Sequence, residues 1–191
     1  LDALGVVSVP VNTRLTPVEV EAILGDVRPR ALVTAREYRN RRYLDEALEI
    51  ADRLDWGLSV LDASDEGPAD AWPVRPARRA TAPPTAPVDD LLCIQYTSGT
   101  TALPKGAMLT RRAYLRTAEY VARCQRLTPS TSFISGAPFF HCSGTMHAIT
   151  TCLVAGCTLN ALSAWDAERF VDQTAKHRCD VSHMIYYRDV L

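Results

Sequence analysis

The sequence has no apolar run that approaches the roughly 20 residues needed to span a bilayer. Its N-terminus also lacks a basic region followed by a hydrophobic segment, which is the pattern of a secretory signal. An excess of one charge is missing too, because 21 basic residues are scattered among 22 acidic ones and the formal net charge is -1. These absences predict a soluble protein with no electrostatic preference for nucleic acid or an anionic membrane.

Several chemical motifs are missing as well. The six cysteines form no CxxC pair and show no zinc-ribbon spacing, and four of them lie in apolar runs. We therefore expect reduced, mostly buried thiols of a cytoplasmic protein. There is no GxGxxG, which excludes a dinucleotide-binding fingerprint, and no Walker loop, in which Gly precedes and Ser or Thr follows the Lys.

The hydrophobic pattern is that of a globular protein in which strands and helices alternate, and this predicts an α/β class with layered, mainly parallel sheets and flanking helices. Thr16, Pro17 and Glu19 predict a helix start with a capping box. Strands are expected over 6–11, 31–34, 58–61, 91–96, 107–109, 132–135, 158–162 and 181–185, and helices from 16 to about 25 or 26, and over 43–54, 111–127, 144–155 and 166–177.

Residues 62–90 are rich in proline, which removes backbone donors, and this indicates an exposed connection with polyproline character. The chain begins without Met in an apolar segment and stops in what has the pattern of a helix start. We expect it to be an internal piece of a longer polypeptide.

A segment rich in small hydroxyl residues follows the strand expected over 91–96. Its small side chains leave backbone N–H groups uncovered, and Lys105 adds a fixed positive charge. Charge-assisted hydrogen bonds contribute about 1.5 to 3 kcal/mol each, so several such donors hold a polyphosphate with Mg²⁺. The alternative is a surface turn. The segment reads Thr97-Ser98-Gly99-Thr100-Thr101-Ala102-Leu103-Pro104-Lys105-Gly106.

Residues 96–106 resemble the signature loop of the adenylate-forming superfamily, which includes acyl-CoA synthetases, aryl-CoA ligases, luciferases and peptide-synthetase adenylation domains. Residues 5–17 (GVVSVPVNTRLTP) resemble the PVNPRLTP region of acyl-CoA ligases, residues 138–141 (PFFH) their PLFH segment, and residues 155–158 (AGCT) their AGAT turn. The resemblance implies that residues 1–191 are part of the large N-terminal, AMP-binding domain, without the C-terminal domain.

The resemblance also implies a reaction. A carboxylate oxygen attacks the α-phosphorus of ATP to give acyl-AMP and pyrophosphate, and coenzyme A then displaces AMP. Lys105 and His141 are the implied catalytic residues, and Thr97 is implied to help place Mg²⁺. The residues implied to hold ATP are Thr97, Ser98, Gly99, Thr100, Thr101, Ala102 and Lys105.

Ala102 departs from the family pattern, which usually has Gly there. If that backbone is left-handed, Ala costs about 1 to 2 kcal/mol. The expectation is that Ala102→Gly tightens nucleotide binding.

The histidines need separate interpretations. His141 follows Phe139 and Phe140 in a loop, and by resemblance it lies near the carboxylate and the adenylate; the alternative is a partly buried structural histidine. His147, His177 and His183 favour structural roles, and a metal site of His141, Cys142 and His147 lacks a fourth ligand. Phe139, Phe140, Met146 and Thr150 fit an acyl pocket and a core equally well.

The leading interpretation is an acid-thiol ligase of the fatty acyl-CoA synthetase type, whose parent protein is an enzyme although this piece alone is not expected to be competent. An aryl or alicyclic acid ligase is the second enzyme hypothesis. A non-catalytic, nucleotide-binding remnant is the alternative of another class, because the YGxTE-like segment and the catalytic lysine of the C-terminal domain do not occur in these residues.

Overall fold

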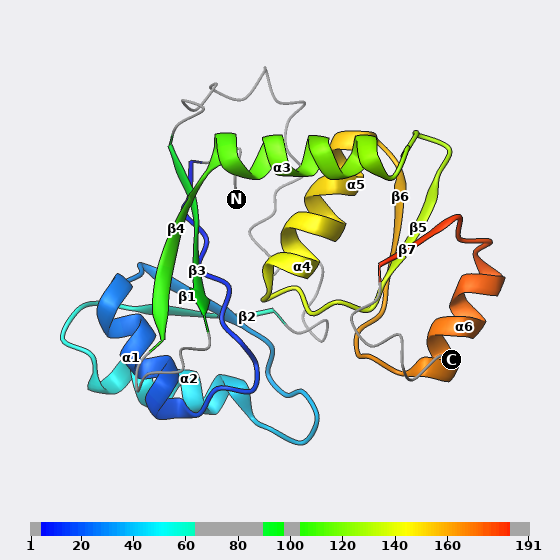
Figure 1. Ribbon diagram of the computed structural model, residues 1–191. Coiled ribbons are helices and arrows are strands. Elements are labelled where there is room, and N and C mark those ends of the chain that lie inside the picture. The colour runs from blue at the N-terminus through cyan, green and yellow to red at the C-terminus, as the bar shows by residue number, and fades with distance from the viewer. Residues whose placement is uncertain (1–4, 64–89, 98–103, 184–191) are drawn as a thin grey trace, which may run out of the picture. The chain divides into compact units, whose positions relative to one another are not determined.

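The computed structural model (Figure 1) describes residues 5–63, 90–97 and 104–183. These residues form two compact units, of which one holds 5–13, 90–97 and 105–183 and the other holds 14–63 and Pro104. Both units combine helices with parallel strands, so the predicted α/β class is confirmed. In the described part of the chain, no helix is long and apolar enough to cross a membrane.

The smaller unit begins with α1 (Pro17–Val27), and the predicted capping box is present. The Thr16 hydroxyl accepts a hydrogen bond from Glu19 N at 3.4 Å, and the Glu19 carboxylate accepts one from Thr16 N at 2.8 Å. These two bonds satisfy N–H groups that a helix leaves open at its start. The helix ends slightly later than predicted, where Arg28 takes a left-handed conformation with φ 43°.

The rest of this unit is a short parallel sheet and one helix. Strand β1 (Ala31–Thr34) pairs in parallel with β2 (Ser59–Asp62), and α2 (Tyr43–Arg53) connects them. Arg53 on α2 forms an ion pair with Glu21 on α1 at 2.6 Å. Because that pair is largely exposed, the packing of buried apolar residues between the helices contributes more to stability. Those buried residues are Ile23, Leu24, Ala47 and Ile50.

The larger unit is built on an antiparallel hairpin, in which β3 (Leu91–Thr97) pairs with β4 (Lys105–Thr110). Helix α3 (Arg111–Cys124) leaves the end of β4, as Figure 1 shows, and the Thr110 hydroxyl caps it by accepting from Ala113 N at 3.3 Å. The helix ends before the predicted residue 127 because Arg126 turns left-handed with φ 54°.

The strand predicted over 6–11 is wrong in extent. Ser8 alone bridges β3, donating from its N to Leu92 O at 3.0 Å and accepting from Ile94 N at 2.9 Å. The next donor of a parallel ladder would be residue 10, but Pro10 has no N–H group. The pairing therefore stops after one bridge.

A parallel sheet forms the second layer of the larger unit. Strand β5 (Ser132–Ser135) lies between β6 (Thr158–Ala161) and β7 (Val181–His183), and α6 (Ala167–Lys176) connects the last two. Phe133 on β5 is buried with Ala148 and Cys152 of the helical segment that follows this strand, and these three residues form the core.

The helix predicted over 144–155 begins earlier and is irregular. It comprises α4 (Cys142–Gly144), a π-helical segment η2 (Thr145–Thr150) and α5 (Thr151–Ala155). The hydroxyls of Thr150 and Thr151 donate to carbonyls five residues earlier, Thr145 O at 2.8 Å and Met146 O at 2.9 Å. These bonds fit the wider π-helical turn, a feature often found at functional sites.

All six cysteines are free thiols, but fewer are buried than expected: Cys93 and Cys152 are buried, whereas Cys124 is exposed. Burial, with a further contribution from Cys157, raises the pKa of Cys152 to about 12, so its thiol stays protonated. Most of the proline-rich connection predicted over 62–90 lies outside the described residues, and Asp62 itself belongs to β2.

Candidate functional site

The predicted phosphate loop joins the two strands of the hairpin. Thr97 is the last residue of β3 and Lys105 the first of β4, and the two face each other in the ladder. The Thr97 hydroxyl donates to Lys105 O at 3.5 Å, and both residues are exposed. We call Thr97 and Lys105 the hairpin mouth. The other residues predicted to hold ATP, namely Ser98, Gly99, Thr100, Thr101 and Ala102, lie outside the described residues, so their roles stay predictions.

Gly106, at the end of the predicted loop, is required by close packing. A Cβ atom there would lie 2.8 Å from Ile94 Cγ2 and 3.1 Å from Tyr96 Cζ, because both side chains of β3 cross the strand over this glycine. Real Cβ atoms essentially never approach another atom as closely as 2.8 Å, and 3.1 Å is tighter than most of their contacts. The glycine therefore lets Tyr96 cover the strand next to the hairpin mouth.

His141, the second predicted catalytic residue, is the N-cap of α4. Its Nδ1 accepts a hydrogen bond from Ser143 N at 3.2 Å, and its carbonyl accepts from Gly144 N at 2.9 Å and Thr145 N at 3.1 Å. Because Nδ1 accepts, the hydrogen-bond pattern assigns the ring proton of the neutral imidazole to Nε2. His141 thus offers an N–H donor on an exposed side chain.

The loop around His141, residues 138–145, is here called the His141 turn. His141 N donates to Pro138 O at 3.1 Å, which closes the turn. Gly144 packs so closely beneath it that a Cβ atom would lie 2.4 Å from Pro138 O. The Thr145 hydroxyl donates to His141 O at 3.2 Å and also lies 3.0 Å from the hydroxyl of Tyr114 on α3. Burial raises the pKa of Tyr114, so its hydroxyl stays protonated and available for this contact.

Gln95 links the two parts of the candidate site, and sequence reasoning missed it. Its side chain is 8% exposed, and its Nε2 donates to Phe140 O at 2.6 Å. Alternation along a strand places Gln95 on the same face as Thr97 and the buried Cys93. A polar residue at an inward position of an apolar strand was the signal in the sequence.

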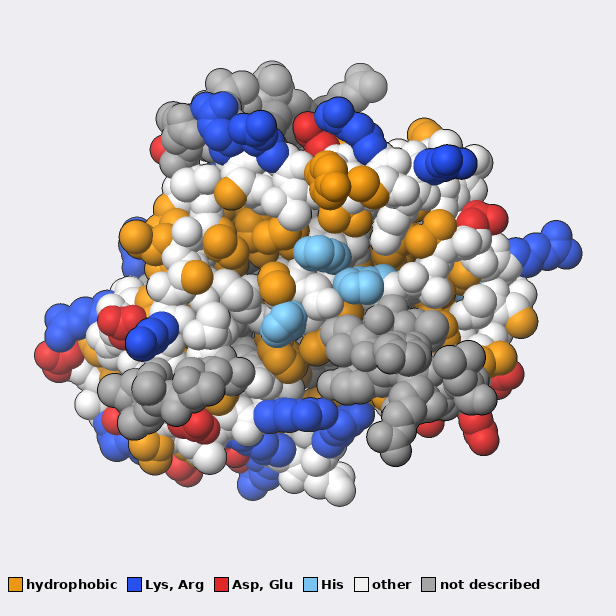
Figure 2. All heavy atoms as spheres, viewed as in Figure 1, with side chains coloured by type: hydrophobic (Ala, Val, Ile, Leu, Met, Phe, Trp, Pro, Cys, Tyr) orange, Lys and Arg blue, Asp and Glu red, His pale blue; other side chains and the backbone are white. Residues whose placement is uncertain are grey.

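The remaining histidines of the region lie beside the His141 turn. His147 on η2 and His183 on β7 stack with ring centroids 5.8 Å apart, and His183 Nε2 lies 3.4 Å from the Ser143 hydroxyl. Burial first, and the nearby His147 second, lower the pKa of His183, so it is neutral at physiological pH. Figure 2 shows histidine side chains close together among hydrophobic ones on the viewed face.

The remaining predictions for histidines concern a helix end and a metal site. His177 follows the last turn of α6, with its Nε2 3.1 Å from Gln173 Oε1, as expected for a residue at a helix end. Among the residues that the structure describes, no group of three or more His, Cys, Asp or Glu side chains is arranged to hold a metal.

Some residues fitted an acyl pocket and a core equally well in the sequence, and Phe139 and Thr150 are two of them. Phe139 is 40% exposed, and its ring covers Gly144, where a Cβ atom would meet Phe139 Cδ1 at 2.8 Å. The Thr150 hydroxyl is committed to the π-helical turn. Neither observation assigns an acid to these side chains.

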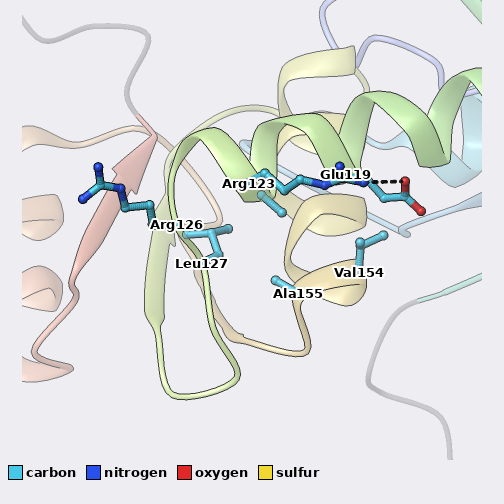
Figure 3. Close-up of a pocket in the computed structure, with 7 residues that line it drawn as sticks. Glu119, Arg123, Arg126, Leu127, Val154 and Ala155 are labelled. Carbon is cyan, nitrogen blue, oxygen red and sulfur yellow. Dashed lines mark ion pairs between the residues drawn. The ribbon is translucent and has the colours of Figure 1, made fainter.

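A shallow surface pocket of about 330 Å³ lies elsewhere in the larger unit, between the ends of α3 and α5. Figure 3 shows the ion pair of Glu119 and Arg123, 3.5 Å apart, along α3, while the Arg126 side chain points away from it. None of the predicted site residues lines this pocket. Its lining residues are Glu119, Ala122, Arg123, Arg126, Leu127, Val154 and Ala155.

Comparisons with known proteins agree with the fold. Long-chain fatty acid transport protein 1 of Rattus norvegicus is 28% identical, and the match covers 95% of this chain and 29% of that protein. Crotonobetaine/carnitine–CoA ligase of Citrobacter koseri is 30% identical, with 97% of this chain and 36% of that protein covered. The crystal structure of ATP-bound MatB from Rhodopseudomonas palustris gives a TM-score of 0.76 at 29% identity, over 92% of this chain and 33% of that chain.

The chain therefore spans about a third of the length of the relatives it matches. The sequence model of the family described as AMP-binding enzyme matches residues 2–186, which is nearly the whole chain. The resemblance first seen in residues 96–106 is confirmed by this match. The chain belongs to the family of AMP-binding enzymes.

Proposed function

We propose that the protein carrying this chain activates a carboxylic acid with ATP and transfers the acyl group to coenzyme A. The observation that carries the proposal is the hairpin mouth, because β-sheet pairing sets Thr97 opposite Lys105 at the two ends of a loop rich in small hydroxyl residues. The similarity to CoA ligases supports the acceptor. Fatty acids remain the preferred class of substrate, and long-chain fatty acid transport protein 1 is among the relatives.

The hairpin mouth suits the phosphates of ATP. Lys105 is exposed and follows directly on the loop, so its ammonium group is free to turn toward a bound polyphosphate. In adenylate formation the carboxylate oxygen forms a bond to the α-phosphorus while the bond to the bridging oxygen of pyrophosphate breaks. Lys105 would stabilise the negative charge that moves onto pyrophosphate.

The residues present also fit Mg²⁺. Thr97 offers a hydroxyl oxygen, which is the hard kind of donor that Mg²⁺ prefers. A cluster of protein ligands is not needed, because Mg²⁺ in such sites takes most of its ligands from phosphates and water. When bound, Mg²⁺ would neutralise charge on the phosphates. Thr97 is the residue we assign to it.

His141 supplies the donor for the acid. With its proton on Nε2, the imidazole can donate to an oxygen of the carboxylate or of the acyl-AMP while Nδ1 stays bonded to Ser143 N. In the second step the coenzyme A sulfur bonds to the acyl carbon and the carbon–oxygen bond to AMP breaks. His141 would hold the acyl-AMP in place for that attack.

The test is acid-dependent exchange of pyrophosphate into ATP, measured on the native polypeptide that contains these residues with a panel of fatty, aryl and alicyclic acids. Exchange that requires an acid is expected, followed by acyl-CoA formation when coenzyme A is added. Nucleotide binding without exchange for any acid would overturn the proposal and favour a non-catalytic remnant. Exchange restricted to aryl acids would move the substrate to that class.

His141→Asn tests the histidine separately. Asparagine is a good N-cap, so α4 keeps its start while the imidazole N–H is lost. Reduced exchange with unchanged stability is expected, and His177→Asn, at the exposed end of α6, is the matched control. Undiminished exchange would remove His141 from the reaction.

A cytoplasmic location, inferred from the reduced cysteines, stays a prediction.

A further inference from the structure

We infer that Gln95 is a positioning residue, which places His141 relative to the hairpin mouth. The inference rests on the proposed function and names a residue whose side chain acts through its neighbour. Gln95 Nε2 donates to Phe140 O at 2.6 Å, and this carbonyl belongs to the peptide bond that joins Phe140 to His141. The bond therefore fixes the orientation of the peptide plane that precedes the Cα atom of His141.

The backbone hydrogen bonds of His141 itself are local, whereas Tyr114 on α3 contacts Thr145 and His183 on β7 contacts Ser143. His141 N bonds to Pro138 O, and His141 O accepts from Gly144 N and Thr145 N. Such bonds fix the shape of the turn but not its place in the protein. The Gln95 bond joins residues 45 positions apart, and so it fixes where the turn lies relative to β3.

Strand β3 carries both Gln95 and the start of the hairpin mouth. Gln95 and Thr97 lie on the same face of one strand, so the residue that anchors the His141 turn and the residue that begins the phosphate loop share one rigid segment. Any shift of the strand moves both together. The distance between a phosphate chain at the hairpin mouth and the His141 imidazole then depends on the strand and on this bond.

The chemistry of the buried amide argues against a purely stabilising role. Gln95 Oε1 is buried without a hydrogen-bond partner among the described residues, although the amide nitrogen is satisfied. An unpaired buried acceptor opposes folding, whereas an apolar side chain of similar length would pack beside Cys93 without that cost. A glutamine here is thus explained by the placement of the Phe140 carbonyl.

The experiment uses Gln95→Met in the native polypeptide, because methionine keeps the length of the side chain and removes the donor. We expect kcat for acid-dependent adenylation to fall about tenfold, because the free energy of one lost hydrogen bond corresponds to roughly that change in rate. KM for ATP should change less than about twofold. Gln173→Met, which removes a glutamine that contacts His177 on exposed α6, is the matched control and should change neither constant.

A double-mutant cycle shows whether Gln95 acts through His141. In a His141→Ala background, Gln95→Met should cause no further loss, because the group that it positions is already absent. The same tenfold loss in that background would overturn the inference, as would full activity of Gln95→Met. Gln95→Asn, which is one methylene too short to reach the carbonyl, should repeat the loss and serves if the methionine variant does not fold.

A readout without catalysis separates this inference from the proposed function. The carbonyl ¹³C resonance of Phe140 and the ring resonances of His141 should shift in Gln95→Met and stay in place in Gln173→Met. Unchanged resonances in Gln95→Met would contradict the positioning role even if the enzyme is active. Shifted resonances in a protein that shows no exchange would keep the link while the proposed reaction failed.

Discussion

The hairpin mouth and the His141 turn belong to the same compact unit but are held in different ways. Thr97 and Lys105 are exposed, and their position follows from the pairing of two adjacent strands. The His141 turn is held instead by side chains from other elements, with Gln95 reaching it from β3 and Tyr114 contacting Thr145 from α3.

This difference separates binding from stability. A side chain at the hairpin mouth can change without disturbing the ladder beneath it, because exposed groups contribute little to folding. A change in the His141 turn affects packed neighbours, so it should alter stability and chemistry together. Variants of the two regions provide the means to test that contrast.

Lys105→Met should have the largest effect on activity. Loss of one charged donor from a polyphosphate site costs roughly a hundredfold in the adenylation rate, whereas the free energy of unfolding should change by less than about 0.5 kcal/mol. Lys176→Met, at the end of α6, replaces the chain's other lysine and is the matched control. Pyrophosphate exchange and denaturant unfolding measure the two quantities. A stability loss above about 1 kcal/mol would break the contrast, since Lys105 would then support the fold.

Gly144→Ala should have the largest effect on stability. The new Cβ atom would lie 2.4 Å from Pro138 O, and that backbone atom cannot move away without opening the His141 turn. We expect the free energy of unfolding to fall by about 1 to 3 kcal/mol, measured in guanidinium chloride.

Gly25→Ala is the control for this change. Nothing lies within 4 Å of a Cβ atom at Gly25, which is in α1, so alanine there should stabilise the helix by up to about 1 kcal/mol. If both variants changed stability in the same direction, the close packing of the His141 turn would not be the cause.

The sequence could predict what depends on near neighbours. Thr16 and Glu19 carry a capping signal within one turn, and both bonds are present. The strands of the hairpin were expected over 91–96 and 107–109, and the structure extends them to 91–97 and 105–110, so that Thr97 and Lys105 lie in strands and not in the loop. The extent of pairing at Ser8 could also have been read from Pro10, because a proline ends a ladder that needs its N–H.

The rest depended on contacts between distant residues. The bond from Gln95 to Phe140 joins positions 45 apart, and no local pattern encodes such a partner. The π-helical turn arises from threonine hydroxyls that bond five residues back, although the same residues also suit an ordinary helix. Sequence patterns therefore located the strands on either side of the hairpin mouth, but not the contacts that hold the His141 turn.

The pH dependence of the free energy of unfolding should show the smallest effect, and it tests the contrast at the His141 turn. His183 touches that turn through Ser143, and burial lowers its pKa below the ordinary 6.5. The unfolded chain therefore binds a proton at His183 at a higher pH than the folded protein does. The stability that depends on the neutral ring is fully present above pH 6.5 and is lost as pH falls from there toward the folded-state pKa.

The slope for one proton is at most about 1.4 kcal/mol per pH unit, and partial exposure of the ring makes it smaller. His183→Gln removes the titrating group, so its unfolding free energy should fall less than that of the unmodified protein as pH drops below 6.5. His177→Gln, at the exposed end of α6, is the matched histidine-to-glutamine control. Chemical unfolding at several pH values measures all three proteins. If the His183→Gln curve ran parallel to that of the unmodified protein, the acid sensitivity would lie outside the His141 turn, and the two regions would differ only in packing.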